Sequence, residues 1–199
     1  MALSNRALQK KREKKKKKRL IKVEHASIHT PSYSHWPIHE CWVPIELWQR
    51  GIGQVIVSRK NNLGDMAVGL YLIDTFCLGV KDCFIRPTFL DEYRNMLAHA
   101  KDCCGEMKIV EPSYATTLIY KAIEYAKQLG FKPHPDFSKT KSLLKDIPLD
   151  ETQNFVFGQN GKPCYMQGPN ESPADIKRIL QTLEHNVGKE NFHFIIEAF

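Results

Sequence analysis

Three carboxylates are the residues of this sequence whose type and spacing could carry out a reaction. Asp74 interrupts the apolar run 66–76, and Asp82 follows eight residues later. A carboxylate on a buried strand costs several kcal/mol unless it is paired or binds a cation. Together with Glu111 (or Glu124), these residues form a candidate catalytic set that would hold Mg²⁺ for phosphodiester cleavage.

A structural role for Asp74 is the alternative: an ion pair with Lys81 or Arg59, or a cap on a neighbouring loop. The order of segments, a hairpin first and then an acidic strand, resembles that of ribonuclease-H-like folds, and this resemblance implies a Mg-dependent nuclease. The chain has no G-x-S-x-G, Walker or G-x-G-x-x-G motif, which argues against α/β-hydrolases, P-loop NTPases and dinucleotide-binding enzymes. Outside the nuclease hypothesis we expect no cofactor.

The second candidate site is electrostatic and lies in residues 1–22. This segment has eleven basic residues and one acidic residue, a net charge of +10, whereas the whole chain carries +7. Residues 23–199 therefore carry −3, from 18 basic and 21 acidic residues. Such a charge block has little apolar surface to bury, so we expect a disordered arm that binds phosphates. The predicted nucleic-acid-binding residues are Lys10, Lys11, Arg12, Lys14, Lys15, Lys16, Lys17, Lys18 and Arg19. A solubilising tail without a specific partner is the alternative.

Composition predicts a cytoplasmic protein. The six cysteines include no C-x-x-C pair, which is typical of reduced thiols rather than of a disulfide scaffold or a zinc site. There is no run of about 18 apolar residues and no secretory h-region, so neither a membrane span nor export is expected. The lysine run also has the composition of a nuclear-localisation segment, which would act in a eukaryotic cell.

Residues 23–50 form a segment rich in proline, tryptophan and histidine. Pro31, Pro37 and Pro44 favour an extended strap over a long helix, with a short helical turn near residues 45–50. The strap also contains all three tryptophans of the chain, Trp36, Trp42 and Trp48. We expect these rings to anchor it to a core, with base stacking as the alternative.

The elements that must position these residues are two hairpins, about three helices and a last strand. The first hairpin joins 54–59 to 66–76 through the Asn- and Gly-containing loop 61–65, and the second strand should be covered on both faces. The other predicted helices are 91–103, 113–129 with an unbroken apolar stripe, and 173–187 with Ser172 as its N-cap. A second hairpin is predicted between 155–157 and 164–166, with Asn160-Gly161 in its turn, and a last strand at 192–196.

This pattern predicts an α+β fold: a single domain with a mixed or largely antiparallel sheet and helices on one face. The predicted division is a basic arm (1–22), the strap (23–50) and a globular domain (51–199). Two functions are compatible with it. The first is nucleic-acid or ribosome binding through the arm, and the alternative is the Mg-dependent nuclease around Asp74 and Asp82.

Overall fold

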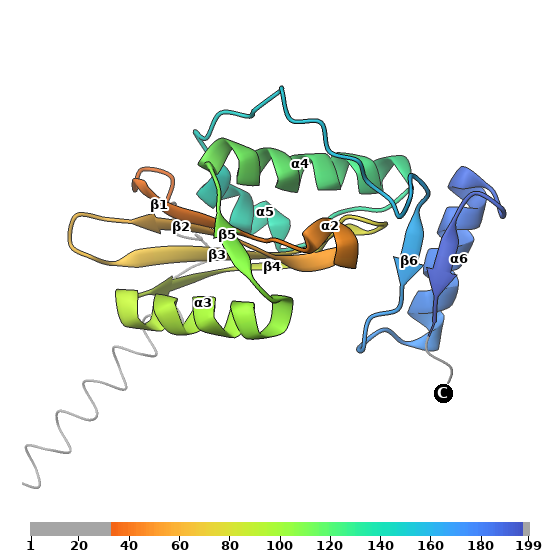
Figure 1. Ribbon diagram of the computed structural model, residues 1–199, viewed down its shortest axis with the longest axis horizontal. Helices are drawn as coiled ribbons and strands as arrows, with labels where there is room; N and C mark the ends of the chain where they lie inside the picture. Colours follow the sequence, from red (N-terminus) through yellow and green to blue (C-terminus); the bar gives the residue numbers. More distant parts are fainter. Residues whose placement is uncertain (1–32, 197–199) are drawn as a thin grey trace, which may run out of the picture. The chain divides into compact units, whose positions relative to one another are not determined.

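A five-stranded antiparallel sheet organises residues 33–196, which are the residues that the computed structural model describes (Figure 1). Its strand order is β4-β3-β2-β1-β5. The strands are β1 (Ile38–Pro44), β2 (Ile52–Lys60), β3 (Met66–Asp74), β4 (Gly79–Thr88) and β5 (Met107–Ile109). The predicted α+β class with a largely antiparallel sheet is confirmed.

The central hairpin β2–β3 follows the loop chemistry of the sequence. The Asn61 side chain accepts hydrogen bonds from the backbone N–H groups of Leu63 and Asp65, both at 2.9 Å. Gly64 has a φ of +90°, which a residue with a side chain adopts only with strain. The loop therefore closes over residues 61–65, where the hairpin was predicted.

Helices cover both faces of the sheet, which corrects the expectation of helices on one face. On one face Val55, Val57 and Tyr71 pack against α4 (Pro112–Gln128). On the other, Ile56, Val68 and Leu70 form a second cluster with Tyr93 and Ala100 of α3 (Leu90–Cys104). Figure 1 shows α4 and α3 on opposite sides of the sheet. Because β2 and β3 are apolar at consecutive positions, each of their faces needs its own cover.

β4 is an edge strand that the apolar pattern did not reveal. It pairs with β3 along nearly its whole length, with a register shift between Leu72 and Ile73. Its sequence, GVKDCFIRPT, mixes apolar residues with Lys81, Asp82 and Arg86. Charged residues and Pro87 are typical of an edge strand, where they discourage pairing with another chain.

The described part of the strap belongs to the sheet. Ile38–Pro44 forms β1, and Leu47–Arg50 forms the short helix α2. Trp36 and Trp48 pack against the α4-side core, and Trp42 packs against the α3-side core. The Trp48 ring stacks on Phe155, with ring centroids 5.4 Å apart. The tryptophans thus lie against the core, as expected of anchors.

The C-terminal segment adds α6 (Pro173–Val187) and a two-stranded parallel sheet of β6 (Cys164–Met166) and β7 (His193–Ile195). Ser172 accepts a hydrogen bond from the Asp175 N–H, and Asp175 bonds back, so the predicted cap of α6 is present. The backbone N–H of Cys164 donates to the Phe76 carbonyl at 3.1 Å, which joins this segment to the turn after β3.

The second hairpin differs from the expectation. Asn160 and Gly161 do form a tight turn with positive φ, closed by a single antiparallel bridge between Gln159 and Lys162. Residues 155–157 form no strand, however, because Phe155 and Phe157 pack their rings on Trp48 and other aromatic side chains. β6 pairs with β7 instead.

Between α4 and β6 the chain forms α5 (Phe137–Thr140) and one turn of 3₁₀ helix, η1 (Lys141–Leu144). Within residues 33–196, no helix is long and apolar enough to cross a membrane.

Candidate functional site

Asp74 caps the turn that joins β3 to β4. It is buried, with 1% of its surface exposed, and its Oδ1 accepts the N–H of Phe76 at 2.9 Å and of Cys77 at 2.8 Å. Burial raises the pKa of Asp74 to about 6, although Lys81 and the backbone donors act in the opposite direction. These two hydrogen bonds are those of a cap on a neighbouring loop, one of the roles considered for Asp74.

The other two predicted carboxylates lie elsewhere. Asp82 is an exposed residue of β4, and its Oδ1 is 3.9 Å from His134 Nδ1. Glu111 is exposed at the start of α4. Among residues 33–196, no group of three or more His, Cys, Asp or Glu side chains is placed to hold a metal ion. The described residues therefore do not assemble the carboxylate cluster that the nuclease hypothesis requires.

The nine basic residues predicted to bind nucleic acid, Lys10 to Arg19, lie outside the described residues. Their role stays a prediction from the sequence.

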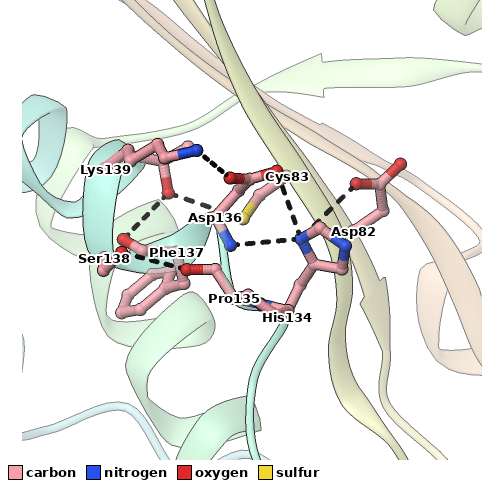
Figure 2. A network of polar contacts seen from close by, with 9 residues as sticks. Asp82, Cys83, His134, Pro135, Asp136, Phe137, Ser138 and Lys139 are labelled. Carbon is pink, nitrogen blue, oxygen red and sulfur yellow. Dashed lines mark hydrogen bonds and ion pairs between the residues drawn. The ribbon is translucent and has the colours of Figure 1, made fainter. Parts of the chain in front are cut away.

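One of the predicted carboxylates, Asp82, belongs to a group of polar residues where the loop before α5 meets β4 (Figure 2). The backbone N–H of His134 donates to the Val80 carbonyl at 2.9 Å, which fixes the loop to the edge of the sheet. His134 Nδ1 accepts the Asp136 N–H at 3.3 Å and has the carboxylates of Asp136 and Asp82 at 3.8 and 3.9 Å.

The tautomer of His134 follows from that bond. A neutral imidazole that accepts at Nδ1 carries its proton on Nε2, so Nε2 is a hydrogen-bond donor. The neighbouring Asp136 carboxylate accepts a hydrogen bond from Lys139 Nζ at 2.6 Å. This bond and the lysine charge hold the pKa of Asp136 below its usual value.

Beside this loop lies a cavity of about 480 Å³, which we call the β4/α6 cavity. Three segments line it: the start of β4, the loop 130–135, and α6 with the residues just before it. Its charged lining residues are Lys81, Lys132, Glu171 and Arg178, and His134 lines it as well.

A partly buried ion pair forms one wall of the cavity. Lys81 Nζ and Glu171 Oε1 are 2.9 Å apart, and their side chains are 13% and 19% exposed. Glu171 Oε2 accepts the Tyr165 hydroxyl at 2.6 Å and the Gly168 N–H at 2.8 Å. Burial alone would raise the pKa of Glu171, but these hydrogen bonds and Lys81 outweigh it, so the pKa lies below its usual value. Glu171 is thus an ionised carboxylate with a partner on each of its oxygens.

None of the residues of this cavity was predicted to form a binding or catalytic site; Lys81 was considered as an ion-pair partner of Asp74. Lys81 and Glu171 are 90 residues apart in the chain, and neither belongs to a motif of fixed spacing. The one local feature that could have indicated this place is the segment 131–137, FKPHPDF, in which two prolines flank His134. Such a sequence predicts a rigid loop.

Comparison of the chain with protein-family models, with curated proteins and with solved structures finds no match in any of the three.

Proposed function

We propose that this protein binds nucleic acid, free or in the ribosome, through the basic arm of residues 1–22. The observation that carries the proposal is the separation of charge along the chain. The arm has a net charge of +10, whereas residues 33–196 contain 18 basic and 19 acidic residues. A polyanion is therefore attracted to one segment and not to the protein as a whole.

The physical basis is counterion release. Each Lys or Arg that neutralises a phosphate frees condensed cations, which gives affinity with little sequence discrimination and a steep salt dependence. The nearly neutral domain would then supply the surface that selects a particular partner. The proposal includes a cytoplasmic location, with nuclear import through the same lysine run in a eukaryotic cell.

Deletion of residues 1–22 tests the proposal. We expect it to lower the affinity for a single-stranded RNA at least about 100-fold at low salt, because the charges that neutralise phosphates are removed. The midpoint of thermal unfolding should stay nearly unchanged, because the described core of the protein is built from residues 33–196. Filter binding at about 50 and 200 mM salt and a thermal melt measure the two effects.

A full-length control separates charge from chain length. In it the eleven Lys and Arg residues of the arm are replaced by Gln, and it should bind as weakly as the deletion. Equal binding by the native and truncated proteins would show that the arm does not bind the RNA.

The nuclease alternative makes a different prediction. It requires Mg²⁺-dependent cleavage of the same RNA, and this cleavage should be lost in Asp74→Asn and Asp82→Asn.

A further inference from the structure

We propose that the β4/α6 cavity binds a small organic anion, with a phosphate-ester or carboxylate group carried on an apolar body. Its volume of about 480 Å³ lies in the range of small-molecule sites, roughly 300–1,000 Å³. This site is separate from the arm and does not rest on the proposed nucleic-acid binding.

The first argument is local charge. Lys81, Lys132 and Arg178 line the cavity, against Glu171 as the one acidic lining residue. The described chain as a whole has slightly more acidic than basic residues, so this positive excess is a property of the cavity. Arg178 is paired at 3.0 Å with Asp175, which lies outside the lining, so among the described residues Lys132 is the lining cation without an ion-pair partner.

The second argument is the set of unused donors. An ammonium group has three N–H donors, and among the described residues Glu171 is the one ion-pair partner of Lys81. Two donors of a largely buried lysine thus remain for a ligand oxygen. His134 adds its Nε2–H, because its Nδ1 is already an acceptor. Both oxygens of Glu171 already have partners, Lys81 on Oε1 and Tyr165 and Gly168 on Oε2, which disfavours a cationic ligand beside it.

The third argument is the apolar part of the lining, which inorganic phosphate alone would leave uncovered. Its members come from all three segments: Leu78 and Val80, then Phe131, Pro133 and Pro135, and finally Ile179. A lining that combines cationic donors with apolar side chains fits a ligand with an anionic head and a hydrophobic body.

The test uses phenyl phosphate and benzoate as probes, with inorganic phosphate and benzyl alcohol as controls for the head and the body. Each is titrated into the full-length protein while backbone amide shifts are followed by NMR. We expect saturable shifts in residues 78–81, 130–135 and 171–182, and an affinity for the better probe at least about tenfold above both controls. The ranking of the two probes tells phosphate ester from carboxylate.

Variants tie the binding to the cavity. Arg178→Gln and Lys132→Met should each weaken the better probe by about five- to tenfold, and Arg178→Lys should restore part of the loss. The Arg178 side chain is 74% exposed, so its replacement should leave the fold intact. Lys177→Met is the matched control, because Lys177 is exposed on the same helix and does not line the cavity.

Three results would overturn the proposal. They are the absence of saturable shifts in the cavity residues, shifts confined to residues 1–22, and an equal loss of affinity in Lys177→Met. Lys81→Met is a poor test of ligand binding, because it leaves the Glu171 carboxylate without its ion-pair partner. The fold would lose stability whether or not a ligand binds.

Discussion

Asp74 and Arg59 are buried charged residues of the two central strands, and the backbone satisfies both of them. Asp74 accepts two N–H groups of the turn that follows it. The Arg59 guanidinium donates to four carbonyls, with N–O distances of 2.6–2.8 Å. Among the described residues neither side chain has an ion-pair partner within 4 Å. Each therefore holds a loop in place, and we expect its replacement to change the stability of the fold.

Asp74→Asn should change how stability depends on pH. The folded pKa of Asp74, about 6, lies above the value of an unfolded aspartate, so the folded state holds the proton more tightly. The titration of Asp74 by itself then costs the native protein about 3 kcal/mol of stability as the pH rises from about 3 to 7, a contribution that Asn does not make. Urea unfolding across this range should show the free energy of unfolding of Asp74→Asn rising relative to that of the native protein as the pH increases.

Asp74→Ala is the control, because it removes the acceptor as well as the charge. It should show the same trend with pH but lie about 1–3 kcal/mol below Asp74→Asn at every pH. Parallel pH curves for the native protein and Asp74→Asn would contradict the raised pKa.

Arg59→Met should destabilise the fold by about 3–5 kcal/mol, because it removes one buried and three partly buried hydrogen bonds from a charged group to backbone carbonyls. Those carbonyls belong to Ser34, Trp36, Leu143 and Lys145, so two distant segments lose their common tie. Arg59→Lys should lose less, since an ammonium can replace some of the bonds but lacks the planar fork. Chemical denaturation measures both.

Arg86→Met provides the comparison for Arg59. Its ion pair with Glu92 is on the surface, with side chains 57% and 46% exposed, and should contribute less than about 1 kcal/mol. Equal losses at positions 59 and 86 would mean that the carbonyl bonds of Arg59 are not what stabilises the fold.

At the scale of elements, the sequence predicted the helices and strands that are marked by features of neighbouring residues. The Asn and Gly residues of 61–65 marked the first hairpin, and the apolar stripe of α4 and the Ser172 cap of α6 marked two helices. β4 was missed because an edge strand needs no continuous apolar pattern. The turn at Asn160-Gly161 was predicted, but aromatic packing of Phe155 and Phe157 prevented the expected strand.

The cavity was beyond prediction for a related reason. Its residues come from three segments that are distant in the chain, and no short motif links Lys81 to Glu171. The role of Arg59 is equally non-local, since one of its acceptors lies 84 residues away. Asp74 shows the opposite limit. The sequence identified it as an unusual residue, but it could not distinguish a capping role from a catalytic one.

Gly79 is the element-scale test, because it sets how closely the start of β4 approaches α4. Its φ is +66°, and an added Cβ would lie 2.6 Å from the Ala122 carbonyl oxygen and 2.8 Å from Ala126 Cβ. Backbone atoms of a packed helix cannot move aside easily, so Gly79→Ala should cost about 2–4 kcal/mol. Thermal or chemical denaturation measures the loss.

Gly64→Ala controls for backbone strain alone. Gly64 has a φ of +90°, but nothing lies within 4 Å of its added Cβ. This variant should lose only about 1–2 kcal/mol. If the two alanine variants lose the same amount, close packing against α4 is not what requires a glycine at position 79.

At the scale of the whole molecule, charge and core occupy different parts of the sequence. The described domain is nearly balanced in charge and is held by apolar clusters on both faces of its sheet. The arm contributes eleven of the 29 basic residues of the chain. Binding of a polyanion and stability should therefore respond to separate sets of mutations, and salt should affect the first far more than the second.

The salt dependence of RNA binding tests this separation. Replacing the five lysines 14–18 by Gln should reduce the magnitude of the slope of log K against log [salt] by about 0.7–0.9 for each phosphate that is no longer neutralised. Replacing them by Arg should keep the slope, because the charge is retained. Gln at the exposed domain lysines Lys108, Lys141 and Lys189 should also leave it unchanged. A slope that responds to the domain lysines as strongly as to the arm would place the phosphate-binding charges on the folded surface, and the arm would then no longer explain the affinity.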